Sequence, residues 1–125
     1  MAKIDKTVIL LKDIYSRAAQ GQRDHLVSAL NVMFINLMNA TDPSAVRRSS
    51  YLTFKTTFEE CGYKGPDAYE PALNVVKELV EFLTENDPKP GRENSDDLER
   101  VSLETFRVKR RERISILKQK LGFVK

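Results

Sequence analysis

The sequence has little of what most catalytic and metal-binding sites require. It contains a single cysteine, Cys61, which rules out a disulfide within the chain. It also contains a single histidine, His25, so a metal site would need carboxylates gathered from elsewhere in the chain. Its 5 glycines are not clustered, which excludes a glycine-rich phosphate-binding loop. We therefore expect no metal and no cofactor, and we expect that the protein is not an enzyme.

Long apolar stretches are also absent. No run approaches the roughly 18–20 consecutive apolar residues that cross a bilayer, and the first residues, MAKIDKTVILLKDIY, lack the pattern of a secretory signal. We therefore predict no association with a membrane. A single cysteine fits a reducing compartment, so the expected location is the cytoplasm.

The composition is that of an ordinary globular domain with a high content of charge. Of its 125 residues, 41% are hydrophobic and 31% are charged. A chain of this length can bury roughly two-thirds of its unfolded surface, which is enough for a core without metals or crosslinks. We therefore expect a single domain.

The charge is sorted into three blocks along the chain. Residues 1–55 carry 8 Lys or Arg against 4 Asp or Glu, a net of +4, whereas residues 56–99 carry 4 against 12, a net of −8. Residues 100–125 carry 9 against 2, a net of +7, so the overall +3 conceals a strong asymmetry. Such blocks concern partners and association rather than fold. They predict that the basic C-terminal segment meets an acidic partner, either a phosphate backbone or an acidic protein surface.

Apolar residues recur at helical spacing, which predicts an all-α fold. Four helices are expected to pack into a core bundle, and a basic C-terminal helix follows a polar linker. The first helix is expected to have Asp5 as its N-cap and to stop before Gly21, and Asp42 with Pro43 marks the start of the third. The expected helices span residues 4–18, 23–40, 43–61, 67–85 and 96–121.

The polar linker divides the chain into three parts. Residues 86–97 contain no apolar side chain, two prolines and a glycine, which is the composition of a linker or an exposed loop. Residues 1–85 are then the helical core, and residues 98–125 are the basic C-terminal helix, all within one domain.

Two of the expected elements leave alternatives open. Ten of the 13 residues from Leu26 to Met38 are apolar, so this helix is either the central core helix, buried on almost every side, or a helix that also buries a face in a homo-oligomer. Residues 51–58, YLTFKTTF, are rich in β-branched and aromatic side chains. We favour a helix there, and a strand is the alternative.

The candidate catalytic residues have simpler explanations. His25 has no second histidine or cysteine near it in the sequence, and Cys61 shares an apolar helix face with Phe54 and Phe58. We interpret His25 as a surface histidine and Cys61 as a buried, inert thiol rather than as a nucleophile pair. Adjacent carboxylates on a helix point about 100° apart, so the pairs at 59–60 and 96–97 are not expected to converge.

The basic C-terminal helix is the strongest candidate for a binding site. Only Glu104 and Glu112 are available as acidic partners on the same helix, so we expect its cations to be exposed or bound to a partner. Reversing Arg110, Arg111 and Arg113 to Glu is then expected to have little effect on folding. The candidate binding residues are Arg107, Lys109, Arg110, Arg111, Arg113, Lys118 and Lys120, with Arg47 and Arg48 as an extension.

Two functions fit this pattern. The first is a non-catalytic helical subunit that binds the nucleic-acid backbone without strong sequence preference, because arginine engages phosphate well and few aromatic residues are near enough to stack on bases. The alternative is a protein–protein assembly or adaptor module. In that case the basic helix docks on an acidic surface formed by Glu78, Glu81 and Glu85 on its own chain or on a neighbouring chain.

Overall fold

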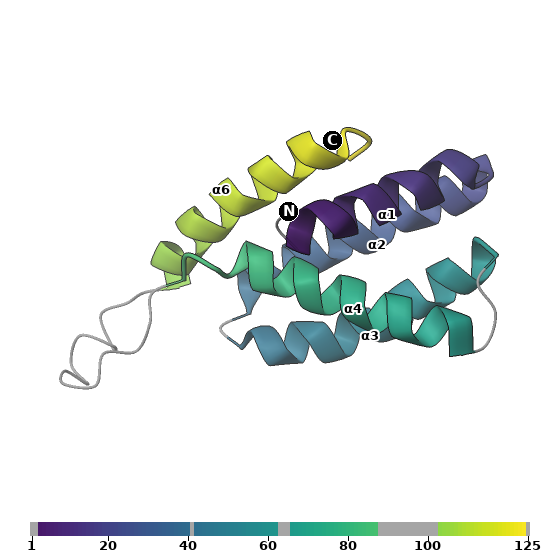
Figure 1. The fold of residues 1–125 in the computed structure, drawn as a ribbon. Coiled ribbons are helices and arrows are strands. Elements are labelled where there is room, and N and C mark those ends of the chain that lie inside the picture. Colours follow the sequence, from purple (N-terminus) through teal and green to yellow (C-terminus); the bar gives the residue numbers. More distant parts are fainter. Residues whose placement is uncertain (1–2, 41, 63–65, 88–102, 125) are drawn as a thin grey trace.

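The computed structural model describes residues 3–40, 42–62, 66–87 and 103–124, and every regular element in these ranges is an α-helix (Figure 1). The prediction of an all-α fold is therefore confirmed. Residues 51–58 lie within a helix, so the alternative of a strand there is wrong. The helices are α1 (Lys3–Arg17), α2 (Gln20–Asn39), α3 (Pro43–Glu60), α4 (Pro66–Leu83) and α6 (Leu103–Leu121).

The first four helices form a closed ring of contacts. Each of α1, α2 and α3 contacts the next helix in the chain, and α4 contacts α1. The last helix, α6, packs on α1, α2 and α4 (Figure 1). Most of the expected linker, residues 88–97, and the expected start of the last helix at residue 96 lie outside the described residues.

The boundary between α1 and α2 differs from the sequence-based expectation. The chain leaves α1 after Arg17 and enters α2 at Gln20, so Gly21 lies inside α2 rather than ending α1. The side chain of Gln22 caps this start, because its Oε1 accepts the Ala19 N–H at 2.9 Å. Asp5 is likewise not an N-cap: it lies in the first turn of α1, where a negative charge favours the helix N-terminus.

The ends of α3 follow local signals. Asp42 caps the helix, with its Oδ1 accepting the Ser44 N–H at 3.0 Å, and Pro43 occupies the first turn, so this predicted start is confirmed. Gly62 has φ +107°, a left-handed conformation that favours glycine, and its N–H donates to the Glu59 carbonyl at 3.2 Å. The turn therefore ends α3 at Glu60, with Cys61 as its C-cap.

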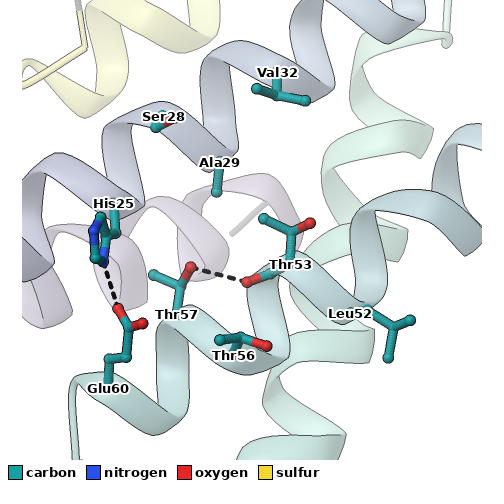
Figure 2. Close-up of a pocket in the computed structure, with 9 residues that line it drawn as sticks. All are labelled: His25, Ser28, Ala29, Val32, Leu52, Thr53, Thr56, Thr57 and Glu60. Atoms are coloured by element: carbon teal, nitrogen blue, oxygen red, sulfur yellow. Dashed lines mark hydrogen bonds and ion pairs between the residues drawn. The ribbon is translucent and has the colours of Figure 1, made fainter.

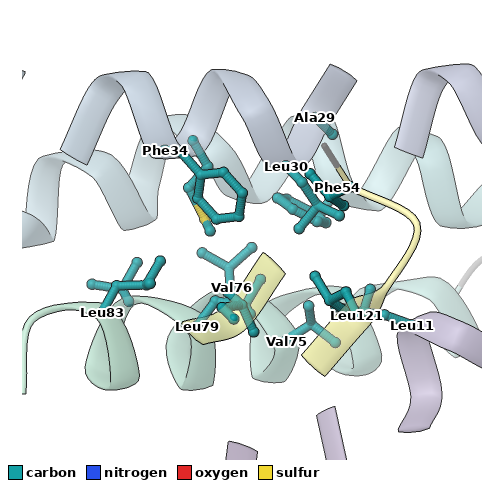
Figure 3. Close-up of a cluster of buried hydrophobic side chains, with 14 of the residues drawn as sticks. Leu11, Ala29, Leu30, Phe34, Phe54, Val75, Val76, Leu79, Leu83 and Leu121 are labelled. Carbon is teal, nitrogen blue, oxygen red and sulfur yellow. The ribbon is translucent and has the colours of Figure 1, made fainter. Parts of the chain in front are cut away.

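The hydrophobic core receives side chains from all five helices. Leu30 and Phe34 of α2 lie with Val75, Val76 and Leu79 of α4 in one cluster (Figure 3). The C-terminal helix contributes Ile114, Leu117 and Leu121 to the same cluster. Because α6 buries apolar side chains as well as basic ones, it is part of the packed structure and not only a charged appendage.

Large apolar side chains are exposed on two helices. Val32 and Ile35 of α2 are 49% and 60% exposed, so the expectation that α2 is buried on almost every side is wrong. On α4, Tyr69 and Leu73 share helical spacing with the buried Val76 but are 50% and 41% exposed. Apolar side chains therefore reach the surface on both α2 and α4.

Candidate functional site

Arg110 lies in the interior of the molecule. Its side chain is 1% exposed and forms an ion pair with Asp87, with Nη2 2.7 Å from Oδ2. Its Nη1 donates to the carbonyl oxygens of Leu37 at 2.6 Å and Ala40 at 2.5 Å, at the C-terminal end of α2. These carbonyls have no partner within their own helix, and a cation at this end also complements the helix dipole. Arg110 thus ties α6 to α2 and to the segment that follows α4.

Two further arginines of α6 point toward the bundle. Arg107 Nε donates to the Met38 carbonyl at 2.9 Å, next to the carbonyls that Arg110 binds. Arg113 Nε donates to the Phe82 carbonyl at 3.0 Å, and its guanidinium lies over the Phe82 ring, 3.8 Å from the centroid. Arg113 also pairs with the Glu85 carboxylate. All three side chains contact the protein's own helices.

The predicted acidic surface lies along α4 and just beyond its end. Glu78, Glu81 and Glu85 all line a hollow together with Lys3 and Ile4 of α1. Of the three, Glu85 also pairs with α6 through Arg113. Among the described residues, α6 therefore contacts only the C-terminal end of the predicted acidic surface through an ion pair.

The two lysines near the end of α6 also face the bundle. Lys118 Nζ lies 5.8 Å from the centroid of the Phe34 ring, and Lys120 Nζ lies 3.4 Å from Asp5 Oδ1. The Lys120 side chain is still 41% exposed, so this pair is a surface contact. The helix ends at Gly122, whose N–H donates to the Lys118 carbonyl at 2.9 Å with φ +79°.

Lys109 and Arg111 are the exposed cations in the middle of α6. The expectation that all of residues 107–113 are exposed or bound to an outside partner is wrong for Arg110, and Arg113 keeps only 16% of its side chain exposed. For the same reason, we now expect the triple reversal to Glu to destabilise the fold, because it would bury a carboxylate beside Asp87.

Arg47 and Arg48 lie on α3, beside a groove between α3 and α4. This groove, called here the α3–α4 groove, has a volume of about 560 Å³ and is lined by Ser44, Arg47, Arg48, Tyr51, Leu52, Tyr69 and Leu73. The rings of Tyr51 and Tyr69 pack edge to face with centroids 5.4 Å apart. Burial and the neighbouring Tyr69 raise the pKa of Tyr51 above its ordinary value. The ring pair therefore forms part of the wall of the groove.

A second hollow lies between α2 and α3 and contains His25 (Figure 2). His25 Nδ1 is 2.7 Å from Glu60 Oε2, and this hydrogen bond raises the pKa of His25 above its ordinary value. The remaining residues that line this hollow of about 410 Å³ are aliphatic or hydroxyl-bearing: Ser28, Ala29, Val32, Leu52, Thr53, Thr56 and Thr57. Both His25 and Glu60 are exposed, and no nucleophilic thiol lines the hollow.

Cys61 stands apart from this histidine. It is half-buried at the C-terminal end of α3, and burial raises the pKa of its thiol above the ordinary value. A raised pKa lowers the fraction of reactive thiolate. Within the described ranges, no group of three or more His, Cys, Asp or Glu side chains is arranged to hold a metal ion.

Comparison with protein-family models, with curated proteins and with solved structures finds no match to this chain. Within the described ranges, none of the helices combines the length and the apolar character needed to cross a membrane. The functional argument therefore rests on the geometry of the molecule.

Sequence reasoning missed the α3–α4 groove and the His25–Glu60 pair. The two arginines at 47–48 were visible as a basic pair, but helical spacing alone does not separate the exposed Tyr69 and Leu73 from the buried residues of α4. The signal in the sequence is the recurrence of polar, basic and apolar residues at helical spacing on α3, at 44, 47–48 and 51–52.

Proposed function

We propose that the protein is a non-catalytic protein–protein assembly module. In this proposal α1–α4 form the core bundle, and the basic helix α6 docks on that bundle rather than on a nucleic acid. The observation that carries the proposal is the position of Arg110, which pairs with Asp87 and binds two carbonyls of α2 inside the molecule.

The distribution of exposed apolar side chains supports an interaction with another protein. Of the eight large hydrophobic residues that are exposed in the described ranges, five belong to α2, α3 and α4: Val32, Ile35, Leu52, Tyr69 and Leu73. Leu52 lines both the hollow on α2 and the α3–α4 groove, so it connects the two apolar regions. A group of exposed apolar residues of this kind is typical of a surface that a protein partner covers.

Binding of the nucleic-acid backbone is the second candidate function. Lys109 and Arg111 are exposed on α6, and neither forms an ion pair with another described residue. Two such cations, with Lys120 about two and a half turns farther along the same helix, would provide phosphate contacts without base recognition. Fewer cations are available for this role than the sequence suggested, which is why we rank it second.

Size-exclusion chromatography of the purified protein with absorbance at 260 and 280 nm separates the two functions. An assembly module is expected to elute free of nucleic acid. At low salt, a labelled oligonucleotide is expected to bind this protein no more tightly than it binds a neutral control protein. A nucleic-acid binder would copurify with absorbing material and lose affinity steeply as salt rises. Loss of that binding in a Lys109→Glu/Arg111→Glu variant would overturn the assembly proposal.

The cytoplasmic location, the single-domain organisation and the homo-oligomer considered from the sequence stay predictions. A homo-oligomer through α2 would cover Val32 and Ile35. Light scattering on the same chromatography run measures the mass and therefore tests this point.

A further inference from the structure

We propose that the α3–α4 groove binds an acidic, amphipathic helix of a partner protein. This inference rests on the proposed function, and it adds the site and the chemistry of the partner. The groove combines an apolar wall formed by Leu52, Tyr69 and Leu73 with two arginines at its edge, Arg47 and Arg48.

The shape of the groove suits a helix. Its residues on α3 recur at 44, 47–48 and 51–52, and its residues on α4 are four positions apart, so both walls follow helix faces. Eight residues of an α-helix rise about 12 Å, which corresponds to about two turns of a bound helix. Helices bind such grooves through apolar side chains at positions i, i+3 or i+4, and i+7.

The charge of the groove selects an acidic partner. Neither Arg47 nor Arg48 has a carboxylate of the described residues within ion-pair distance. Arg17, Arg110 and Arg113, in contrast, each have one. The described residues that line the groove include no acidic side chain, and the nearest exposed carboxylate in sequence on α4 is Glu70. Carboxylates on the polar face of a bound helix would therefore find cationic partners that the described part of the chain does not neutralise.

The same features argue against two other occupants. A symmetric dimer through this groove would place two copies of Arg47 and Arg48 in one interface, and the residues that line the groove include no carboxylate to offset them. A single-stranded nucleic acid would need open ring faces for stacking. Here Tyr51 and Tyr69 pack edge to face on each other, and Leu52 and Leu73 provide apolar surface that phosphates do not cover favourably.

Fluorescence anisotropy with a labelled synthetic peptide tests the proposal. The probe is a helical peptide of about 14 residues, or four turns, with leucines on one face and glutamates beside them. Two control peptides have the same length: one has the leucines scrambled off the common face, and the other has lysine in place of each glutamate. The wild-type protein is expected to bind the probe and neither control.

Variants of the protein locate the binding. Arg47→Glu/Arg48→Glu is expected to weaken binding of the probe by about tenfold or more, with an effect that shrinks as salt rises. Leu52→Ser removes apolar contact and is expected to weaken binding at every salt concentration. Lys109→Glu/Arg111→Glu is the matched double reversal on α6, and Ile116→Ser is the matched apolar change there; both are expected to bind the probe as wild type does.

Several outcomes would overturn the proposal. One is a wild-type protein that does not bind the probe, or that binds all three peptides equally. Another is a loss of binding in the α6 controls as large as in the groove variants. If the wild type binds an oligothymidine and Arg47→Gln/Arg48→Gln weakens that binding more than it weakens binding of the peptide, the groove binds nucleic acid instead. If the wild type is a dimer and Leu52→Ser dissociates it, the groove binds a second copy instead.

The design separates this inference from the proposed function. Circular dichroism confirms that each variant is folded, and the milder Arg47→Gln/Arg48→Gln variant replaces the double reversal if the latter is not. If oligonucleotide binding requires Lys109 and Arg111, the proposed function fails. If the protein is free of nucleic acid but does not bind the probe, only the groove assignment fails.

Discussion

The guanidinium of Arg110 and the carboxylate of Asp87 form a buried ion pair that joins α6 to the segment following α4. Arg110 Nη2 lies 2.7 Å from Asp87 Oδ2, and Nε lies 3.1 and 3.2 Å from the two carboxylate oxygens. The arginine is 1% exposed and the aspartate 15% exposed. Removing either partner would leave a charge in a poorly solvated place, so this pair holds α6 on the bundle together with the buried Ile114, Leu117 and Leu121.

Arg110→Ala is expected to destabilise the protein by about 3 kcal/mol, the lower end of the range for a broken buried pair, because Asp87 keeps some contact with water. The change also leaves the carbonyls of Leu37 and Ala40 without their donor. Urea denaturation followed by circular dichroism measures the free energy of unfolding.

Arg111→Ala is the matched control for this variant. Arg111 is the next residue on the same helix and is exposed, so its removal is expected to change the free energy of unfolding by less than about 0.5 kcal/mol. Equal effects of the two substitutions would contradict the structural role of Arg110.

The two faces of α2 are expected to respond differently to truncation. Leu30 and Phe34 are 0% and 4% exposed, so Leu30→Ala or Phe34→Ala should destabilise the protein by about 2–5 kcal/mol. Val32→Ala and Ile35→Ala remove side chains that are 49% and 60% exposed, and each should cost less than about 1 kcal/mol. Large losses for Val32 or Ile35 in the same denaturation assay would mean that an oligomer buries this face in solution.

Helix formation in this chain could be predicted because its signals are local. Asp42 starts α3 through a hydrogen bond to a residue two positions away, and the turn at Gly122 ends α6 through one to a residue four positions away. Gly21 was misinterpreted because a glycine is tolerated in a first turn, where Gln22 supplies the cap.

The role of the basic residues could not be predicted because their partners are distant in the sequence. Arg110 binds the Leu37 carbonyl across 73 positions, and Arg113 binds the Phe82 carbonyl across 31. A count of acidic residues on α6 itself therefore underestimated how many of its cations are neutralised. The apolar pattern of α4 had a similar limit, because spacing identifies a helix face but not where burial along it stops, as at Tyr69 and Leu73.

The thiol of Cys61 is expected to react slowly. Burial raises its pKa above the ordinary value, so less thiolate is present near neutral pH than in a free thiol. Alkylation by iodoacetamide should be slower in the folded protein than in the same protein in urea. The increase of the alkylation rate with pH should also occur at a higher pH for the folded protein than for glutathione. A folded protein that is alkylated faster than glutathione at neutral pH would indicate an activated cysteine and contradict the non-catalytic interpretation.

The stability of the protein is expected to depend on pH through His25. The hydrogen bond to Glu60, and then the negative charge of that residue, raise the pKa of His25 in the folded state above the 6.5 of the unfolded chain. A raised folded pKa means that folding favours the protonated form, so this stabilisation is fully present below pH 6.5 and is lost as the pH rises through the folded value.

His25→Gln should therefore destabilise the protein more at about pH 5.5 than at about pH 9, where the imidazole is neutral in both states. Urea denaturation of the wild type and the variant at the two pH values measures this difference. Glu60→Gln removes the other partner of the pair, so it should also destabilise the protein more at the lower pH. The effect should be small because both side chains are exposed, and a larger loss on the alkaline side would contradict the assigned pair.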